Sequence, residues 1–161
     1  MVIAARTGQG KTLCFGIPML DICLRRIEKL DEKAEGDEAA IGLRGLILSP
    51  TRELAIQIKD MIEAVVPVEH QERIKVAALV GGMSIQKQQR LLSYKPAIVV
   101  ATPGRLWELM NDQVNAYLLH ALPMIDVLVL DEADRMIADG HFKEMRDILA
   151  HIYTQRLQKK T

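Results

Sequence analysis

A glycine-rich turn that ends in Lys-Thr constrains the fold of this chain more than any other feature. Residues 5–12 read Ala-Arg-Thr-Gly-Gln-Gly-Lys-Thr, and a short apolar run, Val2–Ala5, leads into them. Glycines let backbone N–H groups approach phosphate oxygens closely, and the positive end of a following helix favours the same anions. The turn therefore predicts a strand, a phosphate-binding loop and a helix in succession.

Two side chains of the turn suit a nucleoside triphosphate and its metal ion. Lys11 can reach the β- and γ-phosphates, and the Thr12 hydroxyl can bind Mg²⁺. A second part of such a site follows the apolar run from Val127, where Asp131 can hold Mg²⁺ through water and Glu132 can orient and deprotonate an attacking water. An acidic strand end alone often only caps a helix. Together with the glycine turn it indicates a site for a nucleoside triphosphate and its metal ion.

Short apolar runs alternate with helical patterns along the whole chain. The runs are rich in Val, Ile and Leu with little polar alternation, as expected of strands buried on both faces. They are Val2–Ala5, Leu46–Ser49, Val76–Val80, Ile98–Ala101 and Val127–Leu130. Helical stripes are formed by Leu54, Ile58, Met61, Ile62 and Val65, and by Met145, Ile148, Leu149 and Ile152. The pattern predicts an α/β fold with a parallel sheet and helices on both faces.

Composition excludes several classes of protein. The 161 residues correspond to about one domain, and 21 basic side chains balance 21 acidic ones, which argues against a strongly basic nucleic-acid-binding domain. No apolar run approaches the ~20 residues of a membrane span, and no signal peptide is visible. Cys14 and Cys23 lie in one helix-like stretch. We therefore expect no disulfide framework, no membrane and an intracellular, reducing location.

Three further strand ends carry residues that suit a second anion. Thr51, Ser84 and Thr102 are good N-cap residues, and Arg52 and Arg105 suit phosphate recognition. All strands of a parallel sheet end at one edge, where such folds bind ligands. Only 4% of the residues are aromatic, which favours grip on a sugar–phosphate backbone over base stacking. The alternative is that these residues only cap helices.

The assembled motifs resemble those of DEAD-box RNA helicases. "ARTGQGKT", "PTRELA", "GG", "TPGR" and "DEAD" occur in the order and approximate spacing of that family, over nearly the whole chain. Ala5 fits the family's form of the phosphate loop, whereas Gln9 stands where the family often has serine. The stretches "GGMSIQKQQRLL", "TPGRLWELM" and "DEADRMIADGHF" resemble the subgroup involved in large ribosomal subunit assembly.

The resemblance implies a RecA-like P-loop NTPase fold and a role for each motif. ATP would be bound by Ala5, Arg6, Thr7, Gly8, Gln9, Gly10, Lys11 and Thr12, with Thr12 and Asp131 serving Mg²⁺ and with Lys11, Asp131 and Glu132 serving hydrolysis. Asp134 would couple the nucleotide site to other motifs. RNA would be bound through its backbone by Pro50, Thr51, Arg52, Gly82, Thr102, Gly104 and Arg105. Pre-ribosomal particles and a nuclear or nucleolar location follow from the subgroup.

The family's remaining motifs are not found in this sequence. They are an upstream adenine-reading glutamine motif, a Ser-Ala-Thr motif after the helix near Ile148–Tyr153, and a second RecA-like domain with arginine fingers. We therefore expect residues 1–161 to be part of a first helicase domain. Since an arginine finger alone is worth ~10³–10⁵ in rate, we expect this part by itself to hydrolyse ATP poorly.

Other functions match the motifs less well than the helicase does. A GTPase would show an Asn-Lys-x-Asp guanine reader, and a P-loop kinase would not need "PTRELA" and "TPGR". A truncated, non-catalytic module that binds nucleotide or RNA remains the main alternative. The four histidines, His70, His120, His141 and His151, have no metal-ligand spacing, so we expect no zinc site.

Overall fold

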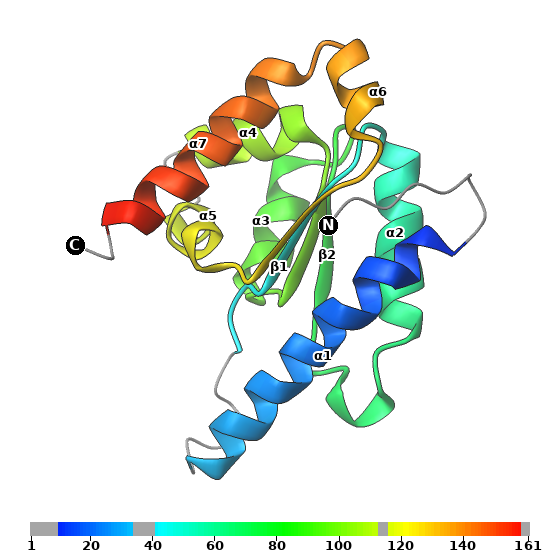
Figure 1. Ribbon diagram of the computed structural model, residues 1–161, viewed down its shortest axis with the longest axis vertical. Coiled ribbons are helices and arrows are strands. Elements are labelled where there is room, and N and C mark those ends of the chain that lie inside the picture. Colours follow the sequence, from blue (N-terminus) through cyan, green and yellow to red (C-terminus); the bar gives the residue numbers. More distant parts are fainter. Residues whose placement is uncertain (1–9, 34–40, 113–115, 159–161) are drawn as a thin grey trace.

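The computed structural model describes residues 10–33, 41–112 and 116–158, so the expected strand Val2–Ala5 lies outside it. Helices and strands alternate along this part of the chain (Figure 1). In chain order they are α1 (Lys11–Glu32), β1 (Gly45–Leu48), α2 (Arg52–Ala64), the 3₁₀ turn η1 (Val68–His70), β2 (Val76–Leu79), α3 (Ile85–Ser93), β3 (Ile98–Ala101), α4 (Pro103–Asn111), α5 (Ala116–Ala121), the 3₁₀ turn η2 (Leu122–Met124), β4 (Val127–Leu130), α6 (Ala133–Ala138) and α7 (Phe142–Gln158).

The four described strands form one parallel sheet in the order β2-β3-β1-β4. Two of the expected strands match the observed bounds. The expected strand Val76–Val80 is one residue too long, and Leu46–Ser49 is shifted by one residue from β1. Strands β1, β2 and β3 are buried throughout, whereas β4 lies at one edge of the described sheet and is partly exposed. The expected parallel α/β sheet is therefore confirmed.

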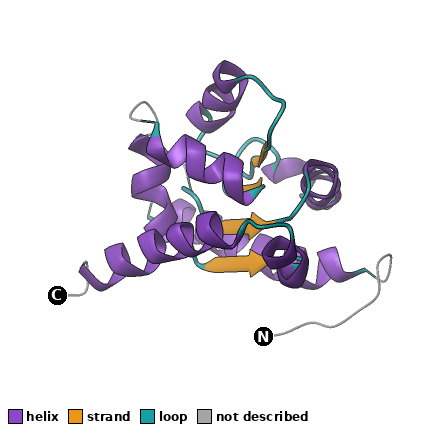
Figure 2. Ribbon diagram, turned by 90° about the horizontal axis from the view of Figure 1, so that it is seen from above, coloured by secondary structure: helices purple, strands orange, loops and turns teal. Residues whose placement is uncertain are grey.

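Alternate side chains of the strands enter two separate cores. In β1, Ile47 joins a core formed with α1 and α2, and Leu46 and Leu48 join a core formed with α4, α5 and α7. The view along the sheet shows helices on both of its faces (Figure 2). Because the side-chain period of a strand is two, this register gives β1, β2 and β3 two buried faces.

The expected apolar stripe of α2 is partly wrong. Ile58 and Ile62 are buried together with Ala55, but Met61 and Val65 are 41% and 43% exposed. Met61 lies beside the buried face, one residue before Ile62, and Val65 follows the end of the helix. The stripe of α7 is confirmed, with Met145, Ile148 and Ile152 buried and Leu149 packed at the margin of the core.

Helix α1 is held close to the rest of the structure by two glycines. A Cβ on Gly16 would lie 3.1 Å from Ile62 of α2, and one on Gly45 would lie 2.9 Å from the sulfur of Met19. The absence of these side chains lets α1 pack directly on α2 and against the start of β1. This packing fixes the start of α1, where the phosphate-binding turn ends.

Both cysteines are free thiols in the structure. Cys14 is exposed, while Cys23 is fully buried, and burial raises the pKa of its thiol to about 12. None of the described helices is long and apolar enough to cross a bilayer.

Candidate nucleotide and nucleic-acid site

The described part of the phosphate turn has the conformation that its glycine predicts. Gly10 has φ +74° and immediately precedes α1, and its carbonyl accepts a hydrogen bond from the Leu13 N–H at 3.1 Å. Lys11 and Thr12 follow in the first turn of α1, both half-buried. The expected ligands Ala5, Arg6, Thr7, Gly8 and Gln9 lie outside the described residues.

Asp131 lies at the end of β4 within electrostatic reach of Lys11. Burial raises the pKa of the Asp131 carboxyl, the Glu132 carboxylate raises it further, and the positive charge of Lys11 opposes both. Such an interaction requires the lysine of the phosphate turn and the acidic strand end to be neighbours. The structure therefore brings together two groups that are 120 residues apart in sequence.

The donor atoms at this place fit a magnesium ion. Thr12 offers a hydroxyl and Asp131 a carboxylate, which are the hard oxygen ligands that Mg²⁺ prefers. Mg²⁺ at nucleotide sites takes one or two carboxylates together with phosphate oxygens and water, so it needs no dense cluster of protein ligands. Accordingly, no three His, Cys, Asp or Glu side chains gather into a metal-binding group within the described residues.

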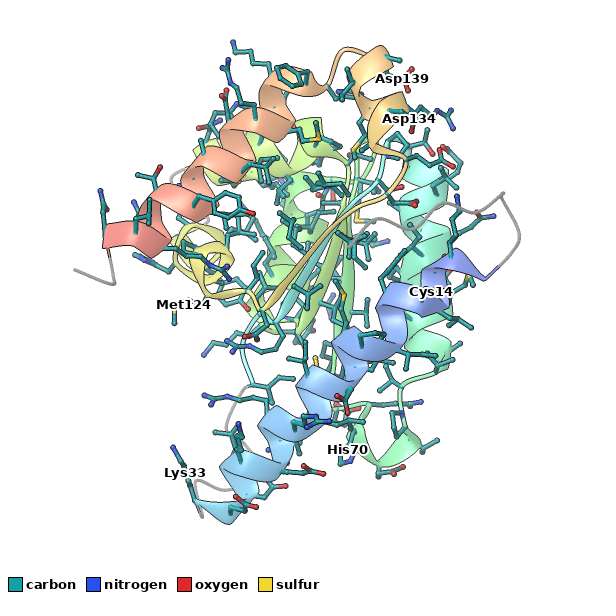
Figure 3. The ribbon with its side chains drawn as sticks, in the orientation of Figure 1. Cys14, Lys33, His70, Met124, Asp134 and Asp139 are labelled. Carbon is teal, nitrogen blue, oxygen red and sulfur yellow. The ribbon has the colours of Figure 1, made fainter. Side chains whose placement is uncertain are left out.

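Glu132 has a backbone conformation that the sequence did not predict. Its φ of 48° and ψ of 51° are left-handed, which is uncommon for a residue other than glycine and clusters at functional sites. The Arg135 guanidinium donates to its carboxylate at 3.4 Å and lies 3.5 Å from the Asp139 carboxylate. Asp134 is exposed on the same short helix, α6 (Figure 3).

A hollow of about 460 Å³ lies at the carboxyl ends of the strands, the same edge as Asp131. Six of the seven residues expected to bind RNA line it: Pro50, Arg52, Gly82, Thr102, Gly104 and Arg105. The seventh, Thr51, instead caps α2, where its hydroxyl accepts from the Leu54 N–H at 3.3 Å. Ser84 caps α3 in the same way, while Thr102 caps α4 without a side-chain hydrogen bond.

Arg105 is largely occupied by contacts within the protein. Its guanidinium donates to the Gln88 side chain at 3.2 Å, to the Met83 carbonyl at 2.9 Å and to Glu108 at 2.6 Å. Gln88 is fully buried and itself donates to the carbonyls of Val80 and Met83, both at 3.0 Å. Arg105 therefore ties α4 to the turn after β2, and fewer of its donors face the hollow than its residue type suggested.

Four residues of this region were not predicted from the sequence. Gly81, Glu108 and His141 line the hollow, and Gln88 supports it from beneath. Gly81 could have been found as the first glycine of the "GG" pair. The positions of Glu108, His141 and Gln88 depend on how the helices pack, and their residue types carry no local signal.

A second, smaller hollow of about 250 Å³ lies at the opposite end of the sheet, where Arg44 precedes β1 and Asp126 precedes β4. Several basic side chains line it, but Arg44 is paired with Asp126 at 3.3 Å and Arg25 with Asp21 at 2.8 Å. These ion pairs reduce its attraction for an external anion. The larger hollow is therefore the better candidate for binding.

Comparison with known proteins identifies the class that this fold and site define. The DEAD/DEAH box helicase family matches the chain over residues 1–161. The chain belongs to this family, which confirms the resemblance drawn from the five motifs.

Individual relatives agree with this assignment. The chain is 48% identical over 153 residues to DEAD-box ATP-dependent RNA helicase 13 of Oryza sativa subsp. japonica, a match covering 91% of this chain and 18% of the relative. It is 44% identical over 146 residues to ATP-dependent RNA helicase MAK5 of Lodderomyces elongisporus, covering 90% and 17%. The chain thus spans about a fifth of the length of these curated relatives.

Solved structures confirm the RecA-like helicase fold. The yeast DEAD-box splicing factor Prp28 matches with a TM-score of 0.74 and 33% identity, over 94% of this chain and 32% of that one. Mss116p, solved with single-stranded RNA and AMP-PNP, matches with a TM-score of 0.73 and 27% identity, over 94% of this chain and 28% of that one.

The raised pKa of Asp131 predicts a stabilising substitution. The folded protein binds the Asp131 proton more tightly than the unfolded chain does, so the ionised carboxylate destabilises the fold. This loss of stability is complete above the raised pKa and disappears below the ordinary pKa of 3.8. We expect Asp131→Asn to raise the Tm by roughly a few degrees near pH 7 without Mg²⁺. Thermal denaturation of Asp131→Asn should show this gain in Tm shrinking below about pH 4. Asp139→Asn, at an exposed position just after α6, is the control and should leave the Tm unchanged.

The conformation of the turn after β2 predicts that a side chain at Gly82 destabilises the fold. Gly82 has φ +75°, and a Cβ there would lie 2.3 Å from an Arg52 guanidinium nitrogen that donates to the Gly81 carbonyl at 3.4 Å. We expect Gly82→Ala to lower the free energy of unfolding by about 1–2 kcal/mol, from left-handed strain and displacement of Arg52. In urea denaturation, Gly81→Ala is the matched control, because its Cβ would meet no atom within 4 Å. Equal losses in the two variants would contradict this account.

Proposed function

We propose that the protein containing this chain is an ATP-dependent RNA helicase. In this proposal Gly10, Lys11 and Thr12 bind the phosphates of ATP, and Asp131 and Glu132 serve hydrolysis. The observation that carries it is that Lys11 lies within electrostatic reach of Asp131. A bound nucleotide and its metal ion require a lysine of the phosphate-binding turn and a carboxylate at the end of a strand to lie close together. Membership of the DEAD/DEAH box helicase family and similarity to ATP-dependent RNA helicases support it.

Magnesium would bind between the phosphates, the Thr12 hydroxyl and Asp131. When bound, it neutralises charge on the phosphate oxygens during transfer. The protein's own residues would do the rest: Lys11 holds the phosphates in place, and Glu132 orients a water and accepts its proton. The left-handed backbone of Glu132 and its Arg135 partner support this role, because both restrict where the carboxylate can lie.

RNA would lie in the 460 Å³ hollow with its backbone against the strand ends. Glycines 81, 82 and 104 leave the main chain accessible there, and Arg52 supplies an exposed guanidinium. Mss116p, a structural relative solved with single-stranded RNA, supports RNA as the ligand. Asp134 would couple this surface to the nucleotide, and a second domain of the whole protein would complete both sites.

The biological setting is a further part of the proposal. The three stretches that resemble the large-subunit assembly subgroup favour pre-ribosomal RNA particles as the substrate and the nucleus or nucleolus as the location. The similarity to proteins named MAK5 is compatible with such a subgroup.

Loss of Lys11 tests the nucleotide site. In the full-length protein, we expect Lys11→Ala to weaken binding of Mg·ATP roughly tenfold or more, because a preorganised charged donor to the phosphates is lost. Isothermal titration calorimetry measures the affinity directly. Lys29→Ala, on the exposed far part of the same helix, is the matched control and should bind normally. Unchanged affinity in Lys11→Ala would show that this turn does not bind the phosphates.

A conservative change at Glu132 tests the chemistry separately from binding. Glu132→Gln keeps the shape and loses the base, so we expect ATP to bind and its hydrolysis to fall by roughly 10²-fold or more. RNA-stimulated phosphate release by the full-length protein is the measurement, with Glu28→Gln on the exposed face of α1 as the control. Normal turnover in Glu132→Gln would exclude it as the catalytic base.

A further inference from the structure

His141 is held at a fixed place by hydrogen bonds of its own main chain. At the end of α6 the N–H of Gly140 donates to the Ile137 carbonyl at 3.2 Å, and the N–H of His141 donates to the Met136 carbonyl at 3.0 Å. Gly140 has φ +84°, so this is a Schellman ending. The His141 carbonyl then accepts from the Met145 N–H at 3.1 Å and starts α7.

The same turn is anchored to the core on both sides. Met136 of α6 is fully buried, and Met145 of α7 is 5% exposed. Figure 1 shows this turn at the same end of the sheet as the start of α2. The position of His141 is therefore set by the packing of two helices rather than by a free loop.

The side chain of His141 lines the hollow with Arg52, Arg105 and Glu108. Arg105 and Glu108 bond to each other, whereas the His141 imidazole has no hydrogen bond or ion pair with any described residue. His151, by contrast, donates a hydrogen bond from its Nε2 to the Leu119 carbonyl at 3.1 Å. An unengaged imidazole in a hollow of glycines and arginines is suited to donate to a phosphate or ribose oxygen.

We propose that His141 is an RNA-binding residue that donates a hydrogen bond to the sugar–phosphate backbone of the strand in this hollow. This inference rests on the proposed RNA-binding function of the hollow and adds a contact from α6–α7, a part of the chain outside the motifs expected to bind RNA. It also gives the bound strand a direct contact with the turn that follows α6, the short helix for which Glu132 is the N-cap residue. RNA and the carboxylates of the nucleotide site then lie just beyond the two ends of this helix.

The test is RNA affinity of the full-length protein, measured by fluorescence anisotropy with a labelled single-stranded RNA and a non-hydrolysable ATP analogue. We expect His141→Ala to weaken binding roughly three- to tenfold, the effect of losing one hydrogen bond of ordinary strength. His141→Lys restores a donor and should retain most of the affinity. His70→Ala is the matched control, because His70 lies at the opposite end of the molecule (Figure 3).

A second variant separates loss of the contact from loss of the fold. His141→Phe keeps a flat ring and removes both nitrogens, so it should bind as weakly as His141→Ala while its Tm stays close to that of the unaltered protein. Unchanged RNA affinity in His141→Phe would contradict the proposed hydrogen bond between the His141 imidazole and RNA. Unchanged affinity in His141→Ala together with a clear loss in Arg52→Ala would overturn the inference alone. No loss in either variant would overturn the RNA surface itself.

Discussion

Three backbone hydrogen bonds just beyond the ends of the strands determine the arrangement of both sites. The Ser49 N–H donates to the Ala101 carbonyl at 3.0 Å, the Thr102 N–H to Leu79 at 3.2 Å, and the Asp131 N–H to Leu48 at 2.9 Å. They extend the parallel hydrogen-bond ladder by one residue, so the segment that follows each strand leaves the sheet beside the adjacent strand. The motif that follows each strand is thereby fixed relative to the next.

The support beneath this edge comes from a buried amide. Gln88 is fully buried, and its hydrogen bonds to Val80, Met83 and Arg105 satisfy both ends of its side chain. An unpaired polar group in such a buried network costs free energy, so the side chains of the network are held in one arrangement. It connects the turn after β2 to the start of α4, two of the four segments that form the hollow.

The sequence was sufficient for features that depend on local pattern. Strands were found because buried parallel strands are short runs of Val, Ile and Leu, and the helix starts at Thr51 and Ser84 because caps have a chemical signature. Features set by packing were missed. Met61 belongs to an apolar stripe by spacing yet is exposed, since the packing of α2 against α1 and the sheet determines how much of the helix is covered. Likewise, the left-handed backbone of Glu132 and the position of His141 result from how α6 is anchored.

The internal pairing of Arg105 has a consequence for how binding responds to ionic strength. The salt dependence of nucleic-acid binding grows with the number of phosphate charges that protein cations neutralise. Here one arginine of the hollow is engaged within the protein, the chain carries no net charge, and much of the lining is glycine main chain. Contacts made by main-chain dipoles release few counterions. This surface should therefore hold a strand through short-range fit, with little long-range attraction for other polyanions and little weakening as electrolyte is added.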